Sequence, residues 1–378
     1  MTPPERPLRI VHVFRSPVGG LFRHVTDLVR GQTARGHKVG IICDDLTGGE
    51  HATRTLEALH SDLSLGVLRL PMGRQISGSD YAVLRKIREH LTQCAPDVIH
   101  GHGAKGGAYA RLAFGAKGPV RAYTPHGGSL LFNGATIVGC FYLTLEKILR
   151  GRTDLFLFES TFIERVYRQK IGTPSAIARI VSNGVADAEF MPVPVRHDAT
   201  DILFVGELRH LKGVDLLLTA LASLRGKGMT LTATIVGQGG SKTELEAQTR
   251  QFGLSDSVRF LKPMPAREAF ALGRIMVIPS RMESFPYIVL ETAAAGKPMI
   301  ATDVGGIPDI FGPYADQLIP SDDAVALERV LASAVNHPET KNNAARLLQD
   351  RIRTTFSLND MVDGGIEGYR AALAQKLK

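Results

Sequence analysis

Residues 9–43, RIVHVFRSPVGGLFRHVTDLVRGQTARGHKVGIIC, decide the fold class. The apolar run at 9–14 has the length of a buried strand, and Gly19 and Gly20 form a turn before a segment with apolar residues at helical spacing. A second apolar run, at 39–43, follows a further glycine. A strand, a turn, a helix and a second strand in this order predict the opening of a doubly wound parallel sheet.

Short apolar runs separated by turns continue along the rest of the chain. They predict strands near residues 96–100, 120–124, 155–158, 178–181, 201–206, 232–236, 258–261, 275–279 and 298–302, and helices at 214–224 and 287–295. The pattern is interrupted near residues 190–197, where Pro192 and Pro194 restrict the backbone. We therefore expect two α/β domains of similar topology, residues 1–190 and 198–357. In such sheets ligands bind beyond the carboxyl ends of the strands.

The charged residues are distributed unevenly between the two halves of the chain. The 378 residues include 45 Lys and Arg and 37 Asp and Glu, a net charge of +8. Residues 1–200 hold 25 basic and 17 acidic side chains, and residues 101–150 hold six basic residues against the single acid Glu146. A basic surface suits nucleic acid, an anionic membrane or a phosphorylated substrate. Only 6% of the residues are aromatic and no nucleic-acid-binding motif occurs, so we expect no nucleic acid partner.

The N-terminal residues lead into a strand without the apolar core of a secretory signal, and no apolar run reaches the roughly 18 to 20 residues of a membrane-spanning helix. We expect a cytoplasmic protein. The longest apolar stretch, 130–145, predicts either a buried helix with its loop or an apolar patch resting on a membrane. With the basic residues around it, residues 101–150 are expected to dock on an anionic bilayer, at the inner face of the cell membrane.

Residues 279–298, PSRMESFPYIVLETAAAGKP, carry the most specific chemistry. Pro286 suits the first turn of a helix, and the free amides that follow it form an anion site suited to a diphosphate. Glu283 lies just before this end and Glu291 about a turn inside it. Carboxylates there would repel phosphate, so we expect them to accept hydrogen bonds from neutral hydroxyls on either side. A nucleotide sugar has this layout.

With Gly296-Lys297-Pro298 and the loop at 303–309, this stretch resembles the retaining glycosyltransferases of family 4, and the resemblance extends over nearly the whole chain, from Gly19-Gly20 to residue 320. It implies the GT-B fold, in which two Rossmann-like doubly wound parallel-sheet domains face a central cleft. By the resemblance, residues 1–190 bind the acceptor, residues 198–357 bind the nucleotide-sugar donor, and the C-terminal helix 358–378 packs back on the first domain.

The resemblance also implies roles for residues of the second domain. Glu283 would contact the donor sugar and Glu291 the ribose. The main chain that would bind the diphosphate belongs to Ser284, Phe285, Pro286, Tyr287 and Ile288. In the loop GELRHLKG at 206–213, Lys212 matches a phosphate-binding lysine, and Glu207 stands where the family has an arginine; Arg209 could supply that charge. Lys212 as a surface lysine is the alternative. Gly206 and Gly237 would lie near the nucleotide.

In the first domain, Gly19 and Gly20 match the family's loop beneath the donor phosphate and the acceptor. His126, in TPHGG, matches a histidine that bonds the transferring sugar. His102, Lys105 and Arg121 are candidates for holding an anionic acceptor, with a solvated surface as the other interpretation of the two basic residues.

We therefore expect a retaining glycosyltransferase of the hexosyltransferase type, acting on a glycan or lipid-linked acceptor in polysaccharide or glycolipid synthesis. No aspartates stand two apart and no His/Cys cluster is evident, so we expect neither metal nor cofactor. Lys212, Arg209 and main-chain amides would neutralise the donor phosphates. The alternatives are a nucleotide-sugar epimerase or hydrolase of the same architecture and a non-catalytic sugar-nucleotide binding protein. The sequence leaves donor base, sugar and acceptor open.

Overall fold

The structure is a computed structural model that describes residues 6–377. The chain divides into two compact units, the first running to Asn183 and including the chain from Leu358 onward, and the second comprising Gly184–Ser357. The expected boundary at 190–197 lies inside the second unit. Its position is set by Val185, which bridges to Ser357, and by Phe190, which is buried in the core of that unit.

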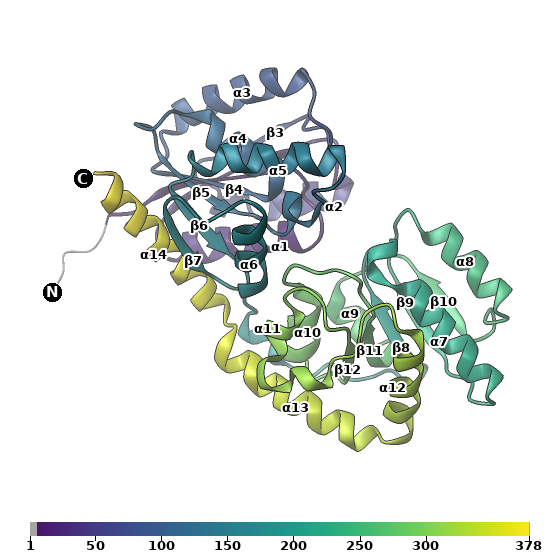
Figure 1. The fold of residues 1–378 in the computed structure, drawn as a ribbon. Helices are drawn as coiled ribbons and strands as arrows, with labels where there is room; N and C mark the ends of the chain where they lie inside the picture. The colour runs from purple at the N-terminus through teal and green to yellow at the C-terminus, as the bar shows by residue number, and fades with distance from the viewer. Residues whose placement is uncertain (1–5, 378) are drawn as a thin grey trace. The chain divides into compact units, whose positions relative to one another are not determined.

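The first unit is a seven-stranded parallel sheet in the order β3-β2-β1-β4-β5-β6-β7 (Figure 1). The strands are β1 (Arg9–Phe14), β2 (Lys38–Asp44), β3 (Val67–Leu70), β4 (Val98–His102), β5 (Val120–Thr124), β6 (Leu155–Phe158) and β7 (Ile177–Ile180). The helices are α1 (Gly19–Ala34), α2 (Gly49–Ala58), α3 (Ser79–Cys94), α4 (Gly103–Ala113), α5 (Ile137–Arg150), α6 (Thr161–Lys170) and α14 (Leu358–Lys376). Each strand predicted in this part of the sequence is present; β3, an edge strand, was not predicted.

The second unit is a five-stranded parallel sheet in the order β10-β9-β8-β11-β12. The strands are β8 (Thr200–Val205), β9 (Ala233–Val236), β10 (Val258–Leu261), β11 (Gly273–Ile278) and β12 (Met299–Ala301). The helices are α7 (Val214–Gly226), α8 (Lys242–Gln251), α9 (Ala266–Phe270), α10 (Tyr287–Ala294), α11 (Ile307–Phe311), α12 (Ala324–Asn336) and α13 (Pro338–Thr355). All five strands match runs predicted from the sequence.

Helix α14, the last of the chain, packs on the first sheet and against α1 (Figure 1). Tyr369 and Ala372 are buried against Leu155 and Leu157 of β6, and Val362 packs with Leu28 of α1. A polar contact also joins this helix to the sheet, because the hydroxyl of Tyr369 lies 2.7 Å from Nδ1 of His100 in β4.

Residues 130–145 form a short helical turn and most of α5, which carries an exposed apolar face. Ile137 is 91% exposed, Ile148 65% and Phe141 54%. The structure therefore favours the apolar patch over a wholly buried helix for this stretch. Among the helices within residues 6–377, none combines the length and the apolar character that a bilayer crossing needs.

Three of the basic side chains at 101–150 form ion pairs and do not add to a free positive surface. These pairs are Lys105 with Asp80 (2.8 Å), Arg111 with Glu146 (2.9 Å) and Arg121 with Asp154 (2.8 Å). The expected basic surface is therefore weaker than the residue count suggests, because half of the charge is neutralised at short range.

The Arg111–Glu146 pair is buried almost completely, and Tyr123 and Ser129 also donate hydrogen bonds to the Glu146 carboxylate. Glu146→Gln would leave the Arg111 charge buried without a counter-charge, so the first unit should lose about 3 to 5 kcal/mol of unfolding free energy. Urea unfolding measures this loss. The exposed pair of Arg54 and Glu50 provides the matched control, since Glu50→Gln should cost less than about 1 kcal/mol. A loss below about 1 kcal/mol in Glu146→Gln would contradict the assignment.

Candidate active site

The carboxyl ends of β1, β4 and β5 lie side by side in the first sheet, and each is followed by residues predicted to contact ligand. Gly19 begins α1 in the left-handed backbone region (φ 63°), which explains the glycine at that turn. His102 ends β4, and His126 follows β5. The sheet therefore brings the predicted histidines and the Gly19-Gly20 loop to one edge.

The backbone at His126 is strained. His126 has a φ of 50°, which few residues other than glycine adopt, and Gly127 and Gly128 follow with positive φ values. Strained residues persist where the surrounding structure holds them, and they are frequent at functional sites. The contact of His126 with the transferring sugar stays a prediction.

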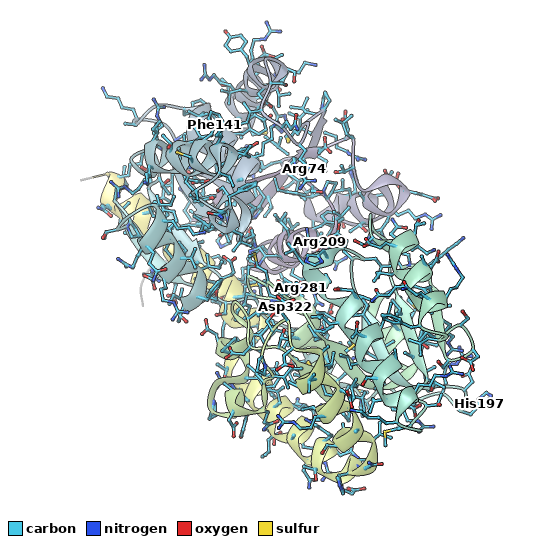
Figure 2. The ribbon with its side chains drawn as sticks, turned by 45° about the vertical axis from the view of Figure 1, so that its right-hand side comes forward. Arg74, Phe141, His197, Arg209, Arg281 and Asp322 are labelled. Atoms are coloured by element: carbon cyan, nitrogen blue, oxygen red, sulfur yellow. The ribbon has the colours of Figure 1, made fainter. Side chains whose placement is uncertain are left out.

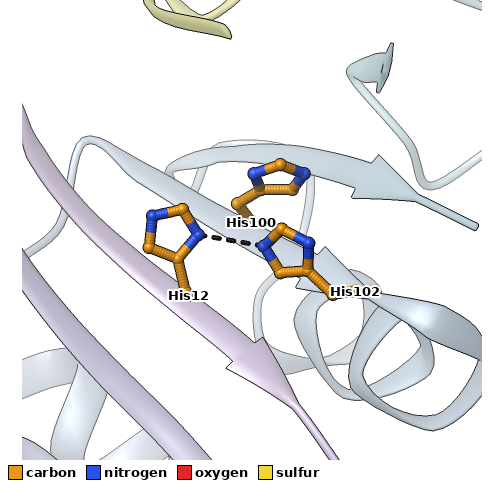
Figure 3. A group of neighbouring side chains, drawn as sticks. All are labelled: His12, His100 and His102. Carbon is orange, nitrogen blue, oxygen red and sulfur yellow. Dashed lines mark hydrogen bonds between the residues drawn. The ribbon is translucent and has the colours of Figure 1, made fainter. Parts of the chain in front are cut away.

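A chain of hydrogen bonds leads from Gln32, inside the first unit, to His126. The Oε1 atom of Gln32 lies 2.9 Å from Nε2 of His12, whose Nδ1 lies 2.9 Å from Nε2 of His102 (Figure 3). The Nδ1 atom of His102 is in turn 3.1 Å from Nε2 of His126. A carboxamide oxygen only accepts, so His12 donates to it through Nε2 and accepts through Nδ1. The same logic places a proton on Nε2 of His102 and of His126, and leaves Nδ1 of His126 as an acceptor.

The amide nitrogen of Gln32 begins a second, longer series of contacts. It lies 3.5 Å from the hydroxyl of Tyr369, which lies 2.7 Å from Nδ1 of His100. Nε2 of His100 lies 2.8 Å from the hydroxyl of Thr124. Hydroxyl groups donate as well as accept, so the Gln32 amide sets the tautomers only in the series that leads to His126, and α14 joins the second series through Tyr369.

Burial keeps these histidines neutral at physiological pH. It lowers the pKa of His12 to about 4 and that of His24 to about 3, and it holds the pKa values of His102 and His126 well below the usual range. Neutral rings are what the hydrogen-bond chain requires, because a doubly protonated imidazole could not accept from its neighbour.

The same histidines form the groups that could hold a metal ion within residues 6–377. They are His12 with His100 and His102, and His24 with His102 and His126, each bringing ring nitrogens within 4.8 Å of one another. This clustering differs from the expectation that the chain has no histidine cluster suited to a metal ion. A bound cation would have to replace the hydrogen bonds between these rings, and metal independence stays a prediction.

Glu159, which follows β6, is a further buried residue that the sequence analysis did not single out. Neither carboxyl oxygen has a hydrogen-bond partner among the described residues, and burial raises its pKa to about 7. The main-chain amides of Glu159 itself, His126 and Gly127 do not form a hydrogen bond of ordinary geometry with the carboxyl group, but they favour its ionised form and partly offset this effect. The position of Glu159 directly after an apolar strand was the feature of the sequence that could have indicated a site residue.

In the second unit, Lys212 and Glu283 meet directly. The Lys212 Nζ atom lies 2.6 Å from Oε1 of Glu283, which also accepts a hydrogen bond from Ser280 at 2.7 Å. Glu283 is 8% exposed, so its carboxylate is fixed in a largely buried position. The structure therefore brings together two of the residues predicted to act in catalysis, although they are 71 positions apart in sequence.

Two glycines allow close approaches between the loops around this pair. A Cβ on Gly213 (φ 68°) would lie 1.9 Å from the carbonyl oxygen of Pro279, and one on Gly305 (φ 62°) would lie 1.8 Å from that of Glu283. A larger residue at 213 would therefore push the Lys212 loop away from the loop that carries Glu283, and one at 305 would push the loop after β12 away from Glu283.

Arg209 and Glu207 form an ion pair at 3.2 Å on the surface of the same loop, and both remain about half exposed. Arg209, which we expected to supply the charge of the family arginine, therefore pairs with Glu207, the residue that occupies the position of that arginine. Arg281, which the sequence analysis did not assign, pairs with Asp215 and Asp322 and donates to the carbonyl of His210 (Figure 2). These contacts raise its pKa and anchor the Lys212 loop.

Helix α10 begins at Tyr287, with Pro286 as its N-cap. Pro286 therefore stands one residue before the first turn in which it was expected. The Phe285 side chain is buried in the core of the second unit, and Ser284 and Ile288 are partly buried. The Phe285 side chain is thus committed to the core, and at the helix start the amide of Val289 donates to the carbonyl of Pro286 at 3.2 Å. Glu291 is partly buried in α10.

The two remaining glycines predicted to lie near the nucleotide approach each other closely. A Cβ on Gly237 would lie 1.9 Å from the carbonyl oxygen of Gly206. Their close approach is a sufficient structural reason for the glycine at 237, and their proximity to a nucleotide stays a prediction.

Two of the acceptor candidates are held in structural contacts. Arg121 lies at the amino-terminal part of β5, opposite the end that leads to His126, and pairs with Asp154 through two nitrogens. The expectation that Arg121 binds the acceptor is therefore wrong for this arrangement. Lys105 pairs with Asp80 and donates to the carbonyl of Gln75, so it holds the 73–80 loop. His102 lies at the edge with His126, but both of its ring nitrogens are already bonded to His12 and His126.

Comparison with known families gives two matches that together span most of the chain. Residues 18–189 match the model described as Glycosyltransferase Family 4, and residues 187–347 match the model described as Glycosyl transferases group 1.

Comparison with individual proteins agrees with these family matches. The chain is 28% identical over 314 residues to D-inositol 3-phosphate glycosyltransferase of Acidothermus cellulolyticus, covering 74% of this chain and 68% of that protein. It is 26% identical over 385 residues to glycogen synthase of Mycobacterium tuberculosis, covering 94% and 92%. Among solved structures, Anabaena HepE in complex with UDP and glucose superposes with a TM-score of 0.80 at 16% identity, covering 96% of this chain and all of that one.

The buried histidines predict a pH dependence of stability. The unfolded chain binds a proton at His12 near pH 6.5, whereas the folded chain does so only near pH 4, so this group destabilises the fold as pH falls between these values. At pH 5 the cost is roughly 2 kcal/mol. His12→Gln should therefore be less stable than the parent at pH 8, yet lose about 2 kcal/mol less on acidification to pH 5. Denaturant unfolding at both pH values measures this.

Exposed His60 provides the matched control. His60→Gln should leave both the stability at pH 8 and the acid loss unchanged. If His12→Gln lost as much stability on acidification as the parent, the buried neutral state of His12 would be disproved.

Proposed function

The chain belongs to the group 1 glycosyl transferases of family 4 and has their GT-B fold, and from this premise we propose that it moves a sugar from a nucleoside diphosphate sugar to a hydroxyl of a glycan or lipid-linked acceptor. The transfer retains the configuration at the anomeric carbon and needs no metal ion. The second unit binds the donor, and the first binds the acceptor.

The contact between Lys212 and Glu283 is the observation that supports this proposal most strongly. A buried carboxylate, fixed by Lys212 and Ser280, can accept hydrogen bonds from sugar hydroxyls without reorganising. The Lys212 ammonium beside it supplies a fixed positive charge for the diphosphate that departs. Sugar recognition and charge stabilisation thus adjoin each other at one point of the second unit.

The start of α10 supplies the second part of the donor site. The main-chain amides of its first turn and the positive end of its dipole suit the diphosphate, in the way that helix starts bind phosphate in other proteins. Glu291, in the next turn, accepts hydrogen bonds from the ribose hydroxyls. Arg209, half exposed and paired at the surface with Glu207, can turn to the diphosphate when the donor binds.

The tautomer of His126 determines which hydrogen bond this residue can form with a ligand. Its Nε2–H is committed to His102, so its Nδ1 accepts a hydrogen bond, and we assign this contact to a hydroxyl of the transferring sugar. A neutral ring is sufficient for this contact, because a sugar hydroxyl carries no charge that His126 would have to neutralise.

The chemical step follows from the groups present. The bond between the anomeric carbon and the diphosphate oxygen breaks, and the acceptor oxygen forms the new bond on the same face. The acceptor proton passes to the leaving diphosphate. Lys212 stabilises the negative charge that develops on this group.

The solved structure of HepE holds UDP and glucose, which makes UDP-sugars the first donors to test. Cell-surface polysaccharide or glycolipid synthesis, in the cytoplasm at the inner face of the membrane, suits an acceptor of the proposed kind. The exposed apolar face of α5 supports peripheral membrane contact more than the basic residues of 101–150 do.

A thermal-shift screen of the full chain against UDP-, GDP- and ADP-sugars should identify one nucleotide that raises the melting temperature. With that donor, we expect nucleotide release to depend on an added acceptor hydroxyl. Release without an acceptor would indicate a hydrolase or epimerase instead, and binding without turnover would indicate a binding protein.

Glu283→Ala should reduce kcat by about 100-fold to 1000-fold, because a fixed charge beside the reacting sugar is lost. Lys212→Met should act similarly. Glu246→Ala, which removes a surface carboxylate of α8, is the matched control and should retain parental rates. Unchanged transfer in Glu283→Ala with every nucleotide sugar would overturn the site assignment.

A further inference from the structure

The first unit contains a pocket of about 810 Å³ at the edge where His102 and His126 lie. Its volume is in the range of pockets that bind small organic ligands. The walls come from α3, α4 and α5, and most of the lining is apolar. The apolar lining includes Leu84, Tyr109, Leu112, Val138, Phe141 and Leu145. A sugar hydroxyl needs polar partners, so this lining is unsuited to a glycan alone.

The charged side chains of the pocket leave a positive excess. Asp80 is neutralised by Lys105, and Glu146 is neutralised by Arg111 behind the wall. Arg15 and Arg74 also line the pocket, and among residues 6–377 neither has a carboxylate partner (Figure 2 labels Arg74). The pocket thus offers two unpaired guanidinium groups beside an apolar interior, and guanidinium groups bind phosphate well.

One wall of the pocket opens toward solvent through apolar side chains. Phe141 and Val138 of α5 line it and are both more than half exposed. Phe132, at the end of the preceding turn, lines it as well and is 39% exposed. An apolar rim of this kind lets a hydrocarbon chain enter without crossing a polar barrier.

We propose that this pocket binds the hydrocarbon chain of a lipid-linked acceptor, and that Arg15 and Arg74 bind the phosphate group that joins this chain to the part receiving the sugar. The proposal rests on the proposed function and narrows its acceptor to an anionic lipid. The apolar interior takes the chain, the two arginines take the phosphate, and His102 and His126 mark the end at which the hydroxyl is presented.

Binding of an alkyl phosphate series to the full chain tests the proposal. Burying one methylene strengthens binding by roughly fourfold, so the dissociation constant from isothermal titration should fall about fourfold per methylene until the pocket is full, and then level off. Alkyl maltosides of equal chain length lack the phosphate and should bind at least tenfold more weakly. A dissociation constant that is independent of chain length would overturn the tail site. Equal binding of the maltosides would overturn the phosphate site.

Matched variants separate the pocket from general adsorption. Phe141→Ser should weaken alkyl phosphate binding about tenfold, whereas Ile148→Ser should not, because Ile148 is exposed on the same helix but does not line the pocket. Arg74→Gln should weaken binding similarly, and Arg152→Gln, at an exposed site outside the pocket, should not. An equal effect of Phe141→Ser and Ile148→Ser would reduce the site to nonspecific adsorption and overturn the proposal.

The outcomes also distinguish this proposal from the proposed function. Chain-length-dependent binding without sugar transfer from any nucleotide sugar would retain the pocket and reject the transferase. Transfer to a phosphorylated acceptor without a hydrocarbon chain, at a rate unaffected by Phe141→Ser, would retain the transferase and reject the pocket.

Discussion

Parallel sheets covered by helices on both faces leave only their strand ends for polar chemistry, and this constraint organises the whole chain. Strands β1, β4 and β5 are almost wholly buried, and Gly19, His102 and His126 lie at or beyond their carboxyl ends. In the second unit, the loops after β8 and β11 bring Lys212 to Glu283 in the same way. The candidate site follows from the topology, because strands distant in sequence end at one edge.

Local counter-charges decide which cations are available at these edges. The net charge of +8 lies in the first half of the sequence, yet Lys105, Arg111 and Arg121 each meet a carboxylate within 3 Å. Arg15 and Arg74 have no such partner among residues 6–377, and they line the apolar pocket. The positive charge available to a ligand of the first unit therefore comes from Arg15 and Arg74 more than from a broad basic surface.

The sequence predicts the strands well because a buried parallel strand is a continuous apolar run. It missed β3, a four-residue edge strand whose side chains are mostly only half-buried or exposed. The predicted roles of Lys212 and Glu283 rested on short motifs that the fold brings together. The hydrogen-bond chain from Gln32 to His126 could not be predicted, because Gln32, His12 and His102 are brought together only in three dimensions. Arg121 was misassigned because its partner Asp154 is on another strand's loop.

The central claim is that the second unit binds the nucleoside diphosphate of the donor through the Lys212 loop and the start of α10. Hydrogen–deuterium exchange of the full chain, with and without saturating UDP, GDP and ADP in turn, tests it most directly. The account predicts that at least one nucleotide slows exchange of the amides at 206–213 and 283–291. Unchanged exchange in both segments with all three nucleotides, or protection confined to the first unit, would contradict it.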